Sequence, residues 1–336
     1  MEADVLDADQ WQQVVGQAVR APSIHNTQPW LFAATGDRLD VRLDPGRALP
    51  AIDPTRRQQV VSCGVAVHFA VVALAALGHA GEAELVPDPA DPDHLATIRV
   101  TGAREPSAAE RELAGAIARR HTDRLPFLDR PVPTGLVDEL QAEIGRDGVW
   151  LKPVSREDEE AATVFLLGQV EQLEQRDPAY LAELHAWTRT DPTASDGVPV
   201  AALPEGDRSR RPSNWLVRDF VADPGAARPP APAAADDEPP PSVEHPAVLL
   251  LGTMSDDRAG WLQAGQALGR LLLRVTVAGL AASPLTQALD QPWARNRLSH
   301  RLALVGHPQM LLRLGYPAGE AVASGRRPVA EVLRVD

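Results

Sequence analysis

Apolar positions in the first part of the chain recur at helical spacing and then in short runs typical of strands. Residues 7–20 carry apolar side chains at intervals of three and four, which predicts an amphipathic helix that Pro22 ends. Residues 28–35 and 39–43 are apolar-rich runs on either side of Gly36-Asp37, which predicts a β-hairpin. The chain therefore begins with a helix, a polar connection and a hairpin.

The most apolar stretch, residues 60–77, predicts a long buried helix. Asp53-Pro54 before it is typical of a helix start, and Gly78 after it suits a helix end. The stretch is nearly long enough to cross a bilayer. We expect instead a central helix buried on all sides, because the stretch is rich in alanine and interrupted by Ser62, Cys63, Gly64 and His68.

The rest of the chain repeats this order of elements without a recognisable sequence repeat. Further strands are predicted at residues 82–86, 96–101, 149–153, 245–252 and 309–314, and further helices at 107–120, 134–144, 155–176 and 257–279. An apolar strand region, a long buried helix and a glycine-ended turn thus occur in both halves. A chain of 336 residues is also long enough for about two domains.

One segment, residues 189–244, interrupts this pattern with dense proline, alanine and acidic residues. Long insertions of this kind in compact proteins are usually lids or disordered linkers. Trp215, Leu216 and Phe220 are apolar anchors that a pure linker would not need. We therefore expect part of the segment to dock on the body of the protein.

Composition narrows the functions that are compatible with this pattern. The 33 basic and 46 acidic residues give a net charge of −13, which disfavours nucleic acid and anionic membranes but permits a phosphate-bearing cofactor held by local arginines. Cys63 is the single cysteine, so no internal disulfide or thiolate metal site is expected, and we interpret it as a small buried apolar residue. The acidic N-terminus has no apolar signal core, which predicts a cytoplasmic protein.

The polar connection between the first helix and the hairpin has the sequence Ala-Pro-Ser-Ile-His-Asn-Thr-Gln-Pro-Trp. Ser23, Asn26 and Gln28 can form hydrogen bonds from this connection. The structural alternative is a helix-ending turn in which such side chains bond to their own backbone.

The pattern Pro-Ser-x-x-Asn-x-Gln-Pro-Trp resembles a signature of the nitroreductase superfamily, and its variant here is most similar to the Acg-like branch. In ordinary nitroreductases, which are homodimers, this loop reaches across from the partner subunit and covers the isoalloxazine and ribityl part of the flavin. The resemblance implies flavin contacts at Pro22, Ser23 and Asn26, with Gln28 as a further candidate.

A second motif, Arg119-Arg-His-Thr-Asp-Arg, follows a predicted helix. It could be a solvated helix end, but Arg120, Thr122 and Arg124 place two cations and a hydroxyl where an extended segment could hold a phosphate. The motif resembles the Arg-x-Ser/Thr-x-Arg/Lys element that opens a nitroreductase subunit and binds the flavin phosphate and ribityl chain. Its position in mid-chain implies that a second nitroreductase-like unit begins near Arg119.

Residues 278–287 form a small-residue segment after a predicted buried helix, where backbone can approach a planar ligand closely. In the resembled family this turn presents backbone N–H groups to flavin N5 and O4, which tunes the flavin potential. The resemblance implies that Leu285, Thr286 and Gln287 lie near the ring. A tight turn between helix and strand is the alternative.

Other arginines are further candidates for anion binding. Gly315-Tyr-Pro, followed by Ser-Gly-Arg-Arg-Pro, resembles the strand end and basic residue that close the family's phosphate clamp, with Arg326 the better match and Arg327 the alternative. Arg56 and Arg57 begin the first buried helix, where cations oppose the helix dipole, and this indicates an anion partner.

Motifs of other chemistries are absent from the sequence. There is no Gly-x-Gly-x-x-Gly after a strand, no Walker loop, no His-Glu-x-x-His pair and no Gly-x-Ser-x-Gly elbow. We therefore expect neither a Rossmann domain nor a metal site. An electron donor such as NAD(P)H would bind transiently over the flavin.

The resemblance implies an α+β nitroreductase-like fold, with two fused lobes that mimic the usual homodimer and hold one FMN between them. The first lobe, residues 1–117, would carry the flavin-covering loop. The second, residues 118–336, would carry the phosphate clamp and a lid insertion at 189–244. The chain would be a monomer that forms a pseudo-dimer, or a weak homodimer.

The function implied is an FMN-dependent oxidoreductase that passes hydride from NAD(P)H to a nitro compound, a quinone or another small acceptor, with no catalytic side chain. The first alternative is a non-enzymatic flavoprotein that stores or sequesters FMN under the lid. A degenerate lobe pair that has lost flavin is the second, and the retained arginines argue against it.

Overall fold

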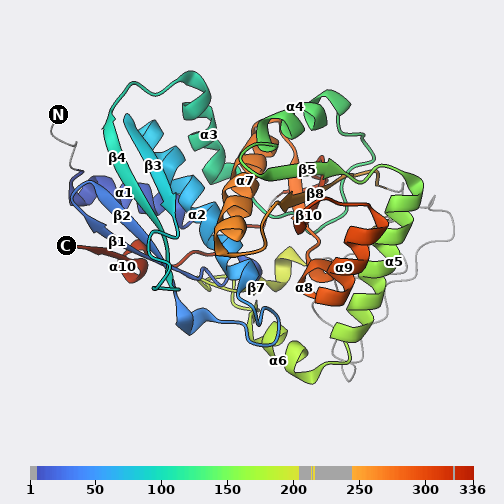
Figure 1. Ribbon diagram of the computed structural model, residues 1–336. Helices are drawn as coiled ribbons and strands as arrows, with labels where there is room; N and C mark the ends of the chain where they lie inside the picture. The colour runs from blue at the N-terminus through green and yellow to red at the C-terminus, as the bar shows by residue number, and fades with distance from the viewer. Residues whose placement is uncertain (1–5, 204–212, 214, 216–243, 321) are drawn as a thin grey trace.

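Two β-sheets flank a central pair of helices in the computed structural model (Figure 1). The structure describes residues 6–203, 213, 215, 244–320 and 322–336. The central helices are α2 (Arg57–Ala76) and α7 (Arg258–Val277), which pack against each other along their length. This mixture of helices and sheets has the α+β class that the resemblance implies.

The first sheet has the strand order β11-β1-β2-β4-β3. β1 (Trp30–Thr35) and β2 (Arg38–Leu43) form the predicted hairpin, and β4 (His94–Ala103) and β3 (His79–Leu85) continue it with antiparallel pairing. At the other edge, β11 (Leu333–Val335) pairs parallel to β1. The end of the chain therefore belongs to the first sheet, although the predicted second lobe included every residue after 117.

The second sheet is antiparallel, in the order β5 (Val149–Pro153), β8 (Ala247–Thr253), β10 (His307–Gly315) and β9 (Ala281–Pro284). β9 lies within the segment predicted as a turn. Its backbone pairs with β10, which satisfies its polar groups inside the protein. A separate two-stranded sheet joins β6 (Thr188–Arg189) to β7 (Val198–Pro199).

Several predicted helices begin at residues that cap them in the structure. Asp7 and Gln10 form a capping box at α1 (Ala8–Ala18), and Ser107 and Glu110 form another at α3 (Ala108–Arg119). The remaining predicted helices are α4 (Thr134–Ile144), α5 (Glu157–Glu174) and α7, whose N-cap is Asp257.

Helix α2 begins later than the sequence predicts. Asp53 and Pro54 lie in a preceding turn, and Arg56 adopts a left-handed conformation with φ 61°, so the helix starts at Arg57. The Asp53 carboxylate still accepts a hydrogen bond from the Gln59 backbone N–H, at 3.0 Å, and so caps the helix across the turn. Gly78 follows the helix with φ 90°, which suits glycine at this position.

α2 is the one helix among the described residues that is long and apolar enough to cross a membrane, and 83% of its most apolar 18-residue window is buried inside the protein. This agrees with a central helix of the core.

Helices α2 and α7 approach closely where a glycine of each helix faces the other. A Cβ atom on Gly64 would lie 2.5 Å from the Leu262 carbonyl oxygen, and one on Gly265 would lie 2.2 Å from the Val61 carbonyl oxygen.

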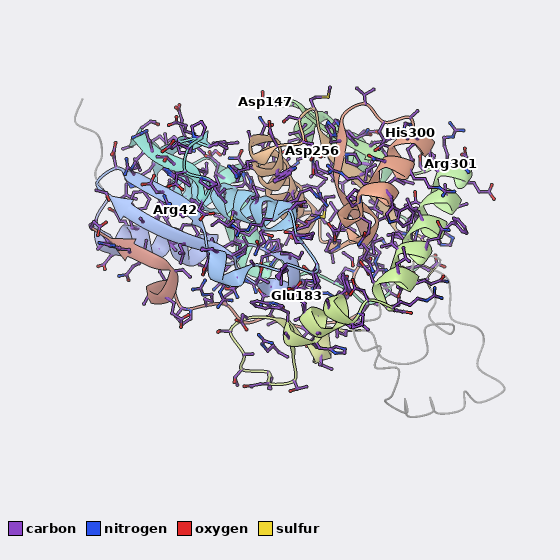
Figure 2. The ribbon with its side chains drawn as sticks, turned by 60° about the horizontal axis from the view of Figure 1, so that its bottom comes forward. Arg42, Asp147, Glu183, Asp256, His300 and Arg301 are labelled. Carbon is purple, nitrogen blue, oxygen red and sulfur yellow. The ribbon has the colours of Figure 1, made fainter. Side chains whose placement is uncertain are left out.

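Short helices that the apolar pattern did not predict connect these layers: α6 (Pro178–Ala186), α8 (Gln287–Asp290), α9 (Pro292–Arg301) and α10 (Val329–Val332). α6 docks on the segment before α2 through Glu183 (Figure 2). The Glu183 carboxylate accepts hydrogen bonds from the backbone N–H groups of Ala51 and Ile52, at 3.1 and 2.7 Å. A polar contact of this kind leaves no periodic signal in the sequence.

Part of the proline-rich insertion contacts the body of the protein, as its apolar anchors predict. Trp215 is buried in a cluster that includes Leu285 and Leu289. Leu216 and Phe220, the other two anchors, lie outside the described residues. The role of the insertion as a lid remains a prediction.

Candidate functional site

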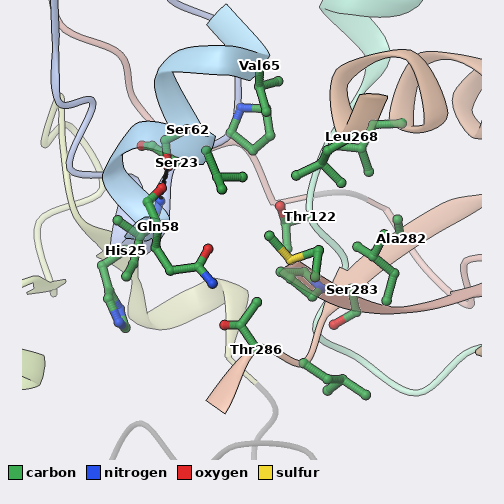
Figure 3. Close-up of a pocket in the computed structure, with 18 of the residues that line it drawn as sticks. Ser23, His25, Gln58, Ser62, Val65, Thr122, Leu268, Ala282, Ser283 and Thr286 are labelled. Carbon is green, nitrogen blue, oxygen red and sulfur yellow. Dashed lines mark hydrogen bonds between the residues drawn. The ribbon is translucent and has the colours of Figure 1, made fainter. Parts of the chain in front are cut away.

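A cleft lies between helix α2 and the second sheet (Figure 3). It contains about 1040 Å³ of atom-free space, including the part open to solvent. One wall is the apolar face of α2, with Val61 and Val65, and Leu268 and Leu272 of α7 lie beside it. The opposite wall comes from β9, the turn after it, and β10. The lining is mainly apolar with a few polar groups, which is typical of a site for a small molecule or a cofactor.

The predicted loop closes one end of this cleft, where Pro22, Ser23 and His25 line it. Three of its residues have positive φ, at 45° for His25, 55° for Asn26 and 52° for Gln28. Such conformations cost free energy in residues other than glycine, and they persist where the surroundings fix them. A loop held in this form presents a defined surface to a ligand.

Hydrogen bonds hold the loop from several elements. The Ile24 backbone N–H donates to the Ser62 hydroxyl of α2 at 3.1 Å, and the Gln28 backbone N–H donates to the Ser23 hydroxyl at 2.9 Å. The Asn26 amide donates to the carbonyl oxygens of Gly197 and Gly325, at 3.0 and 3.1 Å. The loop is therefore fixed by α2, by the segment before the insertion and by the C-terminal tail.

Gln28 holds the loop and does not line the cleft. Its amide nitrogen donates to the Ser195 carbonyl oxygen at 2.7 Å, and its amide oxygen accepts from the Arg327 backbone N–H at 2.8 Å. The fully buried side chain is thus committed to the protein backbone. This arrangement disfavours a direct contact between the Gln28 side chain and a ligand.

A second pocket continues from the first, and the two share Pro22, Ser23, Thr122 and Arg124. It is lined by five arginines and one histidine, and no aspartate or glutamate belongs to its described lining: Arg20, Arg119, Arg120, Arg124, Arg326 and His121. We call it the arginine pocket. Such a concentration of positive charge in a protein of net charge −13 indicates an anion site.

Arg120 gives the strongest indication of an anion site in the arginine pocket. It is 9% exposed, and its Nη2 donates to the Arg20 carbonyl oxygen at 3.2 Å. Its Nε and Nη1 have no hydrogen-bond partner among the described residues. Burial, followed by the nearby charges of Arg326 and Arg124, lowers the pKa of Arg120 to about 9. A buried cation with unused donors is costly unless an anion binds there.

Arg326 lines the same pocket. Burial and the charge of Arg20 lower its pKa to about 10. The sequence alternative, Arg327, points elsewhere, because its guanidinium pairs with Asp44 at 3.2 Å. Of the two tail arginines, Arg326 is therefore the one available to an anion in this pocket.

Three further residues named by the sequence analysis lie in the turn after β9. Leu285, Thr286 and Gln287 all line the cleft. The Leu285 backbone N–H is already bonded to the Leu311 carbonyl oxygen at 2.8 Å, so it cannot donate to a ligand. Thr286 and Gln287 are left as the backbone donors of this turn.

The sequence prediction missed the α2 side of the cleft. Gln58 and Ser62 line it together with the two valines, at the spacing of one helical face. That spacing was visible in the sequence, but in a helix buried all round it does not show which face meets a ligand. The anion partner expected for Arg57 is Asp290 of α8, 2.7 Å away, and Arg56 lies 3.5 Å from Asp93.

Proteins similar to this chain over nearly its full length are found in Mycobacterium tuberculosis strain H37Rv. The chain is 39% identical to Rv3131, provisionally named an NAD(P)H nitroreductase, over 99% of this chain and 93% of that one. It is 32% identical to Acg, provisionally named in the same way, over 100% and 98% of the two chains. It is also 32% identical to the uncharacterised protein Rv3127, over 95% and 91%. No family model matches the chain.

Comparison with solved structures gives weaker likenesses. An FMN-bound nitroreductase of Bacteroides fragilis has a TM-score of 0.38 at 13% identity, over 64% of this chain and 94% of that one. NfnB, an FMN- and NADPH-dependent nitroreductase of Sphingopyxis sp. strain HMH, has a TM-score of 0.40 at 18% identity, over 66% and 97%. These TM-scores are too low to support any conclusion about this chain. From its full-length sequence relatives, the protein belongs to the Acg-like branch of the nitroreductase family.

Proposed function

We propose that this protein is an FMN-dependent oxidoreductase of nitroreductase type, which takes hydride from NAD(P)H and reduces a nitro compound, a quinone or another small acceptor. The names of Rv3131 and Acg support the class of reaction. The two joined pockets support the cofactor, because one is mainly apolar and the other is rich in arginine.

The observation that carries the proposal is the pair of unpartnered donors on buried Arg120. A phosphate monoester would accept hydrogen bonds from them and neutralise the charge that burial disfavours. Arg326 and Arg124 would contribute further charge, and the Thr122 hydroxyl a further hydrogen bond. The arginine pocket therefore suits one terminal phosphate, which favours FMN over a dinucleotide.

The isoalloxazine ring would lie in the cleft, because the residues that the two pockets share connect it to the arginine pocket. Pro22, Ser23 and Asn26 would cover the ribityl side, and the turn at Thr286 and Gln287 would offer backbone donors. Bound FMN supplies a hydride acceptor and donor, and the residues of this chain bind it, orient it and set its potential. The reaction requires no acid–base side chain from the protein.

The two sheets with their central helices represent, in this proposal, two nitroreductase-like lobes in one chain. The loop and Arg20 of the first part, together with the arginines that follow residue 117, would build one complete site, so the chain would act as a monomeric pseudo-dimer in the cytoplasm. α2 and α7 cross at Gly64 and Gly265, which holds the two parts in a fixed relation.

An absorbance spectrum of the purified protein tests the proposal. We expect a flavin spectrum that bleaches when NADPH or NADH is added without oxygen, and a released ligand with the mass of FMN. A flavin that stays oxidised with both donors would contradict the enzyme and favour storage of FMN. Release of FAD, or no flavin after expression with excess riboflavin, would contradict the cofactor.

A further inference from the structure

The loop at residues 22–28 needs support from the rest of the protein. Three of its residues, His25, Asn26 and Gln28, have a left-handed backbone conformation. Residues other than glycine leave such conformations unless the surrounding structure fixes them. The contacts that fix the loop therefore decide whether it is ordered before any ligand binds.

A short turn with the sequence Ser195-Asp196-Gly197 lies against the backbone of this loop. The Asn26 amide donates to the Gly197 carbonyl oxygen at 3.0 Å, and the Gly197 backbone N–H donates to the Asn26 carbonyl oxygen at 3.3 Å. The Gln28 amide donates to the Ser195 carbonyl oxygen at 2.7 Å. The 195–197 turn therefore holds two of the three left-handed residues.

The side chain of Asp196 joins this turn to the loop through Arg47. Arg47 Nη1 donates to the Asp196 carboxylate at 3.0 Å and to the Thr27 carbonyl oxygen at 2.9 Å. The other carboxylate oxygen of Asp196 accepts from Arg189 Nη2 at 2.8 Å. Asp196 thus fixes the guanidinium nitrogen that binds the loop, and Arg189 in turn fixes Asp196.

The pair of Asp196 and Arg47 is partly shielded from water, with side chains 22% and 19% exposed. Burial would raise the pKa of Asp196, but the hydrogen bonds from Arg189 and Arg47 together hold it below its usual range. Asp196 is therefore a carboxylate at neutral pH. Its hydrogen bond with Arg47 is charge-assisted, and such bonds are stronger than those between neutral groups.

We propose that Asp196 is a positioning residue, which acts through Arg47 to hold the loop at residues 22–28 in order and so prepares the cofactor site before FMN binds. This inference rests on the proposed function. Asp196 is not among the described residues that line the cleft or the arginine pocket, so it would act on FMN only through the loop. Apparent affinity falls in proportion to the fraction of molecules in which the binding conformation is present.

Hydrogen exchange of the FMN-free protein, combined with flavin titration, tests this role. The backbone N–H groups of Asn26, Thr27 and Gln28 are hydrogen-bonded within the loop. In Asp196→Ala we expect them to exchange about three- to tenfold faster, and FMN affinity to fall by a similar factor. Exchange in helix α2 should stay unchanged. Riboflavin affinity should fall as much as FMN affinity, because the loop would cover a part that both molecules share.

Two further variants accompany Asp196→Ala. Gly197 has φ 74°, and a Cβ atom there would lie 2.9 Å from the Trp187 carbonyl oxygen, so Gly197→Ala displaces the same turn without removing a charge. It should reproduce both effects. Asp91→Ala is the matched control, because Asp91 pairs with Arg42 at 2.7 Å and neither residue is among the described lining of the two pockets. It should change neither loop exchange nor affinity.

Three outcomes would overturn the inference. Loop exchange that is unchanged in Asp196→Ala would mean that Asp196 does not hold the loop. Faster exchange in α2 as well, with an earlier melting transition, would make Asp196 a residue of general stability. Faster loop exchange with unchanged FMN affinity would mean that order in the loop does not prepare the site. Unmodified protein that binds no flavin would mark failure of the proposed function, and the exchange rates would still decide whether Asp196 holds the loop.

Discussion

The guanidinium groups of Arg120 and Arg326 both donate a hydrogen bond to the backbone carbonyl oxygen of Arg20, at 3.2 and 3.3 Å. Arg120 follows helix α3, and Arg326 belongs to the C-terminal tail, so the chain must fold before the two meet. Burial is the main cause that lowers the pKa values of Arg120 and Arg326, to about 9 and about 10. Folding thus creates a buried positive site whose charge a bound anion would offset.

Arg120→Ala and Arg326→Ala should each weaken FMN binding by roughly ten- to a hundredfold, because each removes a charge-assisted hydrogen bond of about 1.5–3 kcal/mol. Flavin fluorescence quenching on titration of the FMN-free protein measures this. Arg301→Ala is the control, since Arg301 lies on the surface at the end of α9, away from the cleft (Figure 2). A comparable loss in Arg301→Ala would mean that the arginine pocket does not hold the phosphate.

The FMN-free protein should respond to Arg120→Ala in the opposite direction. A buried guanidinium with two unpartnered donors destabilises the empty site, so its removal should leave the melting temperature unchanged or raise it. FMN should then raise the melting temperature of the variant less than that of the unmodified protein. A variant that melts much earlier without FMN would show that Arg120 has a structural partner instead.

Gly64→Ala and Gly265→Ala should destabilise the protein by about 1–3 kcal/mol or more, because the added methyl group would meet backbone atoms of the facing helix. Both variants should also lose FMN, since the cleft depends on where α2 lies. Gly115→Ala in α3 is the matched control: a Cβ there meets nothing within 4 Å, so about 0.5–1 kcal/mol of stabilisation is expected. Chemical denaturation of the three variants decides the matter, and a mild effect at both crossing glycines would contradict the close packing.

Asp53 should make stability fall as the pH rises. Burial, and then the charge of Asp290, raise the pKa of Asp53 from 3.8 to about 6. A raised carboxyl pKa means that the folded state binds the proton more tightly, so this contribution is complete below about pH 4 and lost as the pH rises through about 6. The difference corresponds to roughly 3 kcal/mol.

Unfolding free energies of the protein and of Asp53→Asn, measured from pH 4 to pH 7, isolate this effect. The asparagine still accepts the hydrogen bond from the Gln59 backbone N–H but does not titrate in this range. We expect the unmodified protein to lose stability relative to the variant over this interval. A constant difference between the two would show that Asp53 ionises at its ordinary pKa.

Trp215→Ala should speed the release of FMN, because Trp215 packs in the same buried cluster as Leu285, which lines the cleft. If the insertion also gates the donor, stopped-flow bleaching by NADPH should become faster in the same preparation. Faster release with unchanged bleaching would make the segment a structural cover only. If neither rate changes, the insertion does not restrain the flavin.

Local signals predicted much of the fold. The hairpin around Gly36-Asp37 and the capped helices α1 and α3 follow from short-range chemistry, and all are present. The pairing of β11 with β1 has no such signal, because a parallel partner from the other end of the chain leaves no trace in the residues near either strand. The late start of α2 depends on the left-handed conformation of Arg56, which Asp53-Pro54 did not indicate.

Part of the candidate site could likewise be predicted from local sequence, and part of it depends on contacts between distant segments. The resemblance in residues 22–28 and 119–124 led to the loop and the arginine pocket. Gln58, which lines the cleft, was missed, because the sequence does not show which face of α2 meets the cleft, and its hydrogen-bond partner Asp290 is 232 positions away. The structural use of Gln28 was also hidden, since its partners Ser195 and Arg327 belong to distant segments.

We propose that the arginine pocket holds the phosphate of a flavin whose ring lies in the cleft. Titration of the FMN-free protein with FMN and with riboflavin, which lacks the phosphate, tests it most directly. We expect FMN to bind at least about a hundredfold more tightly, because two or more charge-assisted hydrogen bonds are lost with riboflavin, and we expect Arg120→Ala to narrow that gap by about tenfold or more. Equal affinities for FMN and riboflavin, or an affinity ratio that Arg120→Ala leaves unchanged, would mean that the flavin phosphate does not bind in the arginine pocket.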